Sequence, residues 1–218
     1  MKMQICETFV SHAGEVNVGR FAFFIRLAKC NLRCGFCDSP YAKESYVDIQ
    51  IDDMVKQAEH FPRVVITGGE PLLQIDEIIK FIEKLKKKNP DVVIEIETNG
   101  TIKPRGNALK DIVWNVSPKL KNSGHEYKER INGDAINWFI MANANFKFVV
   151  NDENDIDEVV LLVHNFGIRK RQVFLMPQGK TKEEQLAKME PVIKLARKLG
   201  YNFSPRLHVL IYGNKRGV

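Results

Sequence analysis

Three cysteines within one short stretch are the residues of this chain best suited to chemistry. Cys30, Cys34 and Cys37 have a C-x3-C-x2-C spacing, so their thiolates can converge on one metal centre. A closed zinc site takes four ligands, whereas a four-iron cluster held by three cysteines keeps one iron open for chemistry. Cys6 lies far away behind an apolar run, and we expect it to be a small buried residue rather than a fourth ligand.

Two simpler interpretations of the three cysteines stay open at this point. They could hold a structural zinc ion together with His12 or a later histidine. Two of them could instead form a redox pair, with the third uninvolved. The spacing alone does not distinguish these sites from an open iron–sulfur cluster. The evidence for one of them has to come from motifs further along the chain.

The composition is that of an ordinary globular protein. The 218 residues are 44% hydrophobic and 28% charged, which favours a single domain spanning residues 1–218 with a sizeable core. No apolar stretch reaches the ~18–20 residues that cross a bilayer, and the N-terminus has no secretory signal. Most of the cysteines lie in one loop and do not resemble a disulfide framework. We therefore expect a cytoplasmic protein that does not bind membranes.

The positive charge does not mark a nucleic-acid binder. The net charge is +6, and the densest basic run, residues 84–88, falls where a helix is expected to end. Cations at that position complement the helix dipole, whereas a nucleic-acid binder would concentrate its charge on one surface. We expect no nucleic-acid partner, and a small anionic substrate is compatible with the surplus.

Apolar strands alternate with helical stretches along the chain. Helices are expected at 48–60, 74–88, 124–143, 155–166 and 181–199, the last opened by a capping box of Thr181 and Glu184. Strands are expected at 3–10 (an edge strand), 21–27, 64–67, 92–96, 112–116, 146–150, 172–175 and 207–212. About six strands carry the repeating pattern, fewer than the eight of a full barrel. The prediction is an α/β fold, a partial, open (β/α)6-type barrel with a short N-terminal strand extension.

Polar or glycine-rich clusters follow several of these strands. Barrel strands end at one mouth, so the clusters are expected to build one site there. Arg26 lies inside the apolar strand 21–27, where a charge is either functional or paired structurally. The clusters are the cysteine loop, Thr-Gly-Gly-Glu-Pro at 67–71, Glu-Thr-Asn-Gly at 97–100, Ser-Pro-Lys at 117–119 and Met-Pro-Gln-Gly at 176–179.

The cysteine spacing after the first barrel strand and the Gly-Gly-Glu-Pro run at 68–71 after the second resemble the radical S-adenosylmethionine (SAM) superfamily. The resemblance implies that Cys30, Cys34 and Cys37 ligate a [4Fe-4S] cluster. Its open iron would take the amino and carboxylate groups of SAM. The turn at 68–71 would offer backbone carbonyls and a carboxylate to the amino group, because glycine lets the backbone approach closely.

A narrower resemblance covers nearly the whole chain. Residues 24–39, together with Gly14–Glu15, the strand-end clusters and Arg206–His208, are similar to the 7-carboxy-7-deazaguanine synthase family. The similarity implies a carbon–nitrogen lyase that contracts the ring of 6-carboxy-5,6,7,8-tetrahydropterin and releases ammonia, in queuosine or archaeosine biosynthesis for tRNA modification. It also implies SAM and Mg²⁺ as cofactors, an external one-electron reductant such as flavodoxin or ferredoxin, and a homodimer.

The same resemblance implies roles for individual residues, with no catalytic side chain beyond the cluster and the SAM-derived radical. Ser39 stands where the family has a Thr that binds Mg²⁺, and a hydroxyl is an acceptable oxygen ligand. Arg26 would pair with a substrate carboxylate, since its fork matches carboxylate geometry. The other substrate contacts would be His12, Ala13, Gly14, Glu15 and Thr98. The SAM contacts would be Phe36, Cys37, Asp38, Gly69, Glu70, Gly100, Ser117, Pro118, Lys119, Met176, Pro177, Gln178 and Gly179.

The chain departs from the family pattern in one loop. The family often has Gln-Gly-Glu-Gly where this chain has Ala13 to Val16, so either His12 or backbone groups would replace the lost amide. The role of His208 is left open by the sequence, since a lone histidine in an apolar strand such as 207–212 is more often a core residue than a functional one.

Two rival functions are weighed against this assignment. The first is a radical SAM activase that makes a glycyl radical on a partner protein, but there the third cysteine is usually followed by His-Asn, and here Asp38 and Ser39 follow it. The second is a structural-metal module that binds RNA. Metal analysis separates it, since the module would hold zinc without iron or sulfide.

Overall fold

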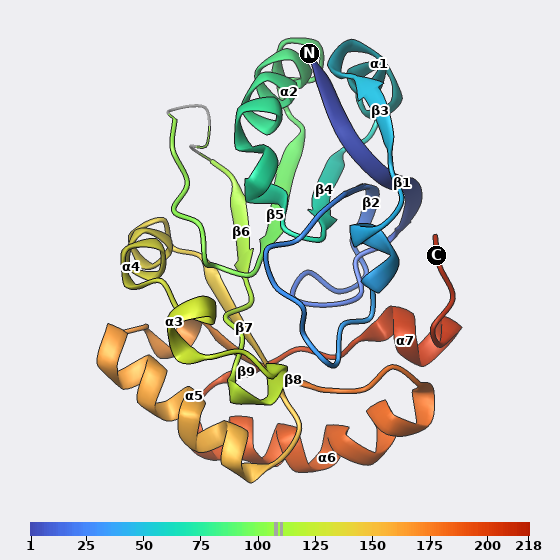
Figure 1. Ribbon diagram of the computed structural model, residues 1–218. Helices are drawn as coiled ribbons and strands as arrows, with labels where there is room; N and C mark the ends of the chain where they lie inside the picture. Colours follow the sequence, from blue (N-terminus) through green and yellow to red (C-terminus); the bar gives the residue numbers. More distant parts are fainter. Residues whose placement is uncertain (107–108, 110) are drawn as a thin grey trace.

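The computed structural model describes residues 1–106, 109 and 111–218. Within these residues the chain forms a nine-stranded sheet in the order β3-β1-β2-β4-β5-β6-β7-β8-β9 (Figure 1). β1 pairs antiparallel with β2 and β3, and the other neighbouring strands are parallel. The strands are β1 (Lys2–His12), β2 (Phe21–Leu27), β3 (Val47–Gln50), β4 (Arg63–Gly68), β5 (Val93–Thr98), β6 (Val113–Val116), β7 (Asn145–Val150), β8 (Val173–Pro177) and β9 (Asn202–Phe203).

The larger helices lie around the outside of the curved sheet (Figure 1). Their apolar sides cover the outward face of the strands, and Phe81, Phe139, Phe146 and Phe148 are fully buried between the two layers. The α-helices are α1 (Ile51–Ala58), α2 (Ile75–Lys88), α3 (Tyr127–Arg130), α4 (Gly133–Met141), α5 (Glu153–Phe166), α6 (Lys182–Leu199) and α7 (Leu207–Tyr212). Short 3-10 turns are η1 (Pro40–Lys43), η2 (Pro71–Gln74), η4 (Lys121–Ser123) and η5 (Lys170–Gln172).

Local sequence explains where the long helices begin and end. The expected capping box opens α6, since Thr181 Oγ1 accepts from the Glu184 amide at 3.2 Å and the Glu184 side chain accepts from the Thr181 amide at 3.3 Å. Asp152 caps α5 in a similar way, and Gly167 ends it with a φ of 64°. No helix among the described residues combines the length and the apolar character needed to cross a membrane.

The predicted open barrel is confirmed, since its six expected strands are β2 and β4 to β8, and the sheet does not close. Four details of the prediction are wrong. The first strand is not an edge strand, because β3 pairs with its other side and takes residues 47–50 out of the helix expected at 48–60. The helix expected at 124–143 is divided into α3 and α4. Residues 207–212 form a helix, and the last strand is β9.

Candidate active site

The carboxyl ends of the parallel strands open onto a cavity of about 260 Å³. The cysteine loop, the strand ends, α7 and the C-terminal residues all contribute to its wall. Of the residues expected to bind metal, cofactor or substrate, it brings together His12, Gly14, Glu15, Arg26, Cys30, Cys34, Phe36, Cys37, Asp38, Ser39, Gly69, Thr98, Ser117, Lys119, Met176, Gln178 and Gly179.

Five expected site residues stand outside the cavity wall: Ala13, Glu70, Gly100, Pro118 and Pro177. Ala13 is buried and closes its own loop, because its amide donates to the Arg20 carbonyl at 2.7 Å and its carbonyl accepts from Gly19 at 2.8 Å. The loop therefore presents His12, Gly14 and Glu15 to the cavity. Ala13, which stands where the family often has glutamine, makes only backbone hydrogen bonds within the loop.

Glu70 is fully buried and its carboxylate is occupied within the protein. Oε1 accepts from Thr98 Oγ1 at 2.7 Å and from the Leu72 amide at 3.0 Å, and Oε2 accepts from the Asn99 amide at 2.7 Å. Burial raises the pKa of this carboxyl in spite of these donors. In this structure Glu70 fixes the ends of β4 and β5 to each other.

The cysteine loop is held in place by residues that follow β5 and β6. Asn31 Nδ2 donates to Thr101 Oγ1 at 2.8 Å, and its Oδ1 accepts from Asn99 Nδ2 at 2.9 Å. The Arg33 amide donates to His125 Nε2 at 2.8 Å. These contacts fix the loop from outside the cysteines themselves.

The three thiols are half-buried and free. Burial raises the pKa of Cys30 and of Cys34. The Leu32 amide donates to Cys30 Sγ at 3.4 Å, a contact of the kind that tunes iron–sulfur thiolates. Among the described residues, no three His, Cys, Asp or Glu side chains already stand close enough to share one metal ion. The donor set of three thiols in one loop, on one cavity wall, fits a cluster with an open iron.

The glycine turn after β4 lies directly against the cysteine loop. A Cβ on Gly69 would stand 1.9 Å from the Lys29 carbonyl oxygen and 3.0 Å from Cys30 Cβ, so only glycine fits. The Glu70 amide donates to the same Lys29 carbonyl at 2.8 Å. This close approach brings the turn beside the thiols, where a ligand of an open iron would lie.

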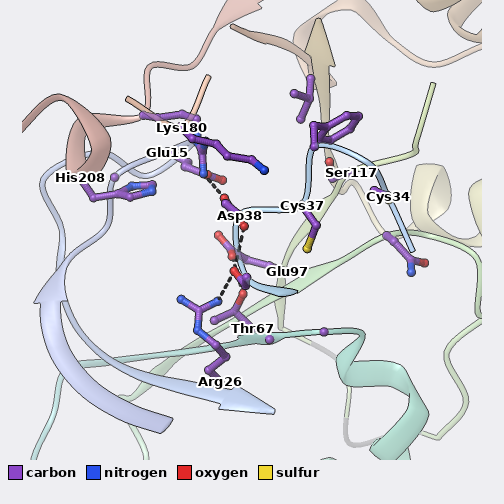
Figure 2. Close-up of a pocket in the computed structure, with 18 of the residues that line it drawn as sticks. Glu15, Arg26, Cys34, Cys37, Asp38, Thr67, Glu97, Ser117, Lys180 and His208 are labelled. Atoms are coloured by element: carbon purple, nitrogen blue, oxygen red, sulfur yellow. Dashed lines mark hydrogen bonds and ion pairs between the residues drawn. The ribbon is translucent and has the colours of Figure 1, made fainter. Parts of the chain in front are cut away.

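A chain of charged groups crosses the cavity from the cysteine loop to β7. Arg206 pairs with Asp38 and lies 3.5 Å from Glu15 Oε1, and Lys147 on β7 pairs with Glu15. Burial opposes ionisation of Glu15, but Lys147 and then Arg206 lower its pKa to about 2. Arg206 likewise holds the pKa of Asp38 well below its usual range, against the effect of burial. Figure 2 shows Asp38 between Cys37 on one side and Glu15 and His208 on the other.

Arg26 and Ser39 are in contact at the other end of this arrangement. Arg26 Nη1 donates to Ser39 Oγ at 3.2 Å, and Ser39 Oγ donates to Asp38 Oδ1 at 2.8 Å. A hydroxyl beside a carboxylate is a pair of hard oxygen donors, which fits Mg²⁺ completed by water or substrate oxygens.

Several residues of the cavity were missed or misplaced by sequence reasoning. The sequence placed His208 in a strand and left its role open, but it lines the cavity from α7, and burial lowers its pKa. Lys147, Glu97 and Asn115 also line it. Lys147 lies within the largely apolar strand β7 (Asn145–Val150), and the reasoning that singled out Arg26 could have found it.

Comparisons with known proteins identify the family of this chain. A sequence model of the radical SAM superfamily matches residues 24–189. The 7-carboxy-7-deazaguanine synthase of Pyrobaculum aerophilum is 32% identical, over 99% of this chain and 97% of its own length. That of Hyperthermus butylicus is 35% identical, over 96% of this chain and 92% of its own. The crystal structure of Streptococcus suis SuiB bound to S-adenosylmethionine matches 84% of this chain and 50% of its own, with a TM-score of 0.56 at 17% identity, and so shares the fold.

Proposed function

Because this chain belongs to the radical SAM superfamily and, within it, to the 7-carboxy-7-deazaguanine synthase family, it is a lyase, and we propose that it makes 7-carboxy-7-deazaguanine. The substrate is 6-carboxy-5,6,7,8-tetrahydropterin, whose ring contracts with loss of ammonia. SAM would serve as a cofactor, and Mg²⁺ would support the reaction.

The observation that carries this proposal is that one cavity joins the three cysteines, the glycine turn and Arg26 beside Ser39. Cys30, Cys34 and Cys37 would hold the [4Fe-4S] cluster. When bound, the cluster and SAM would supply the radical chemistry that takes a hydrogen atom from the substrate. Backbone groups at Gly69, together with the side chains of Ser117 and Lys119 and the loop at Gln178, would hold SAM.

The protein's own groups would bind and orient the pterin. Arg26 offers a guanidinium to its carboxylate, and Ser39 with Asp38 would hold Mg²⁺ beside the same carboxylate. His12, Gly14, Glu15 and Thr98 also face the cavity. The Glu97 carboxylate accepts from Thr67 Oγ1 at 2.8 Å, which orients it as an acceptor for the amino groups of a pterin.

The wider setting is part of the proposal. Residues 1–218 would act as one radical SAM domain, in a cytoplasmic homodimer that receives electrons from flavodoxin or ferredoxin. The product would enter queuosine or archaeosine synthesis, and the enzyme itself would act on the small molecule and not on RNA.

An anaerobic reaction followed by mass spectrometry tests the function. The protein, reconstituted with iron and sulfide, is mixed with SAM, Mg²⁺, a strong reductant and 6-carboxytetrahydropterin. We expect the mass of 7-carboxy-7-deazaguanine, absent when the cluster is left out and strongly reduced without Mg²⁺. Formation of 5′-deoxyadenosine without that product would contradict the substrate while keeping the radical chemistry.

A further inference from the structure

Several segments of the chain meet at Glu7, a residue of β1 that stands behind the cavity wall. Glu7 is the cross-strand partner of Arg26 on β2, and its Oε1 accepts from Arg26 Nε at 2.7 Å. The same oxygen accepts from Tyr41 Oη of η1 at 3.0 Å. Its second oxygen lies 3.3 Å from Arg216 Nη2, near the C-terminus. One carboxylate therefore contacts β2, η1 and the end of the chain.

The last six residues, Gly213–Val218, form a C-terminal tail that returns to the cavity after α7. Gly213 and Gly217 have φ values of 63° and 69°, which let the chain turn back. The tail from Lys215 onward lines the cavity. Arg216 lies over the Tyr41 ring with its Cζ 3.6 Å from the centroid, a close cation–π contact. Figure 1 shows the C-terminus on the same side of the molecule as β1.

We propose that Glu7 is a positioning residue, which holds Arg26 ready for the substrate carboxylate and fastens the tail over the same part of the cavity. Its part concerning the substrate rests on the proposed function. Glu7 occupies Arg26 Nε, while Arg26 Nη1 donates to Ser39 and the residue lines the cavity. Without this carboxylate, the two guanidinium groups beside Tyr41 would lose the anion that pairs with both of them, and their mutual repulsion would be less well balanced.

The tail is tested first, with no cofactor or substrate present. Trypsin must take an arginine side chain into its specificity pocket, and Arg216 cannot enter it while it is paired with Glu7 and stacked on Tyr41. The rate at which trypsin removes residues 217–218 is measured by intact-mass spectrometry. Glu7→Gln should speed this cleavage about fivefold, the scale of a partly exposed ion pair. Glu190→Gln, which breaks the exposed pair with Lys194, is the matched control and should change nothing.

The same variant is then assayed with 6-carboxytetrahydropterin. Arg26 would bind the carboxylate equally in the ground state and in the transition state, so Glu7→Gln should raise KM roughly tenfold, the scale seen when a supporting partner is lost. The kcat should stay within about threefold of the wild type. Glu7→Asp keeps the charge and should recover a substantial part of the lost affinity. A residue that only stabilised the β1–β2 pair would lower the melting temperature without this division between KM and kcat.

The outcomes separate this inference from the proposed function. Equal tryptic cleavage of wild type and Glu7→Gln would overturn the role of Glu7 in holding the tail, and an unchanged KM would overturn its role in positioning Arg26. Either result leaves product formation by the wild type intact. Wild-type protein that makes no 7-carboxy-7-deazaguanine would instead contradict the proposed function, while the cleavage assay still decides the tail contact.

Discussion

Arg206, immediately before α7, forms an ion pair with Asp38 of the cysteine loop, 168 residues earlier in the chain. The same guanidinium donates to the Gly179 carbonyl at 2.6 Å and lies 3.5 Å from Glu15. One buried cation thus connects the cysteine loop, the loop after β8 and the loop after β1, which no backbone ladder joins in the described residues.

Replacing Arg206 should therefore cost stability as well as activity. Arg206→Gln leaves Asp38 without its cation and Glu15 with Lys147 alone, and we expect a loss of about 2–3 kcal/mol in the free energy of unfolding. Arg105→Gln, which breaks an exposed pair with Asp76, should cost below ~1 kcal/mol. Urea unfolding measures both, and equal losses would contradict a structural role for the buried cation.

The turn after β4 should tolerate no side chain at its second glycine. Gly69→Ala places a Cβ against the Lys29 carbonyl, so we expect a loss of about 1–3 kcal/mol and poor iron incorporation. Gly35 lies within the cysteine loop, but its Cβ would meet nothing within 4 Å. Gly35→Ala is therefore the control, and it should keep both stability and iron content.

Three of the four cysteines should be needed for the cluster, and Cys6 should not. Cys34→Ala should lose the brown chromophore, most of the iron and all formation of 5′-deoxyadenosine, because in the proposed function three thiolates would hold the cluster. Cys6→Ala should retain all three, since Cys6 lies on β1 away from the cysteine loop. Iron and sulfide analysis checks the pair, and retained activity in Cys34→Ala would remove the cluster from the mechanism.

Ser39 should set the Mg²⁺ requirement. Ser39→Ala removes the hydroxyl that contacts Asp38 and Arg26, and we expect the half-saturating Mg²⁺ concentration to rise roughly tenfold. Ser39→Thr keeps the hydroxyl and should behave as the wild type does. Identical Mg²⁺ titrations for the alanine and threonine variants would show that the ion binds elsewhere.

Glu15 should make stability depend on acidity. Its pKa falls from an ordinary 4.5 to about 2 in the folded protein, so the unfolded chain takes up a proton first as the pH falls. The stabilisation is complete above about pH 5 and is lost progressively toward pH 2, amounting to about 2–3 kcal/mol. Urea unfolding measures this, since between about pH 5 and pH 2 the free energy of unfolding of the wild type should fall more steeply than that of Glu15→Gln. Parallel pH dependences for the two proteins would refute the coupling.

Much of the fold could be predicted because its signals are local. Each buried parallel strand is a short apolar run, and each strand end carries polar or glycine residues that sequence shows directly. The prediction of a strand at 207–212 was wrong, because a short apolar run fits a strand or a helix equally well. Only the pairing of β8 with β9 and the contacts of Arg206 settle it as a helix.

The site was harder to predict where its residues act through distant partners. Glu70 belongs to the motif, yet its carboxylate is occupied by Thr98 and by the amides of Leu72 and Asn99, a pairing that no spacing reveals. Lys147 belongs to the site because it pairs with Glu15, which lies 132 residues away in the sequence. The role of Glu7 could not be predicted either, because it depends on the register of β1 against β2, which places Glu7 opposite Arg26.

The open side of the barrel has a mechanical consequence. Between the loop after β1 and α7 the wall consists of side-chain contacts around Arg206 and one backbone bond, from the Leu207 amide to the Gly14 carbonyl at 2.7 Å. A seam of this kind can part and reseal while every strand keeps its ladder, because local opening breaks only the contacts it crosses. In a fully closed sheet the same opening would break strand pairing, whereas here it breaks only the few contacts that cross this side of the wall.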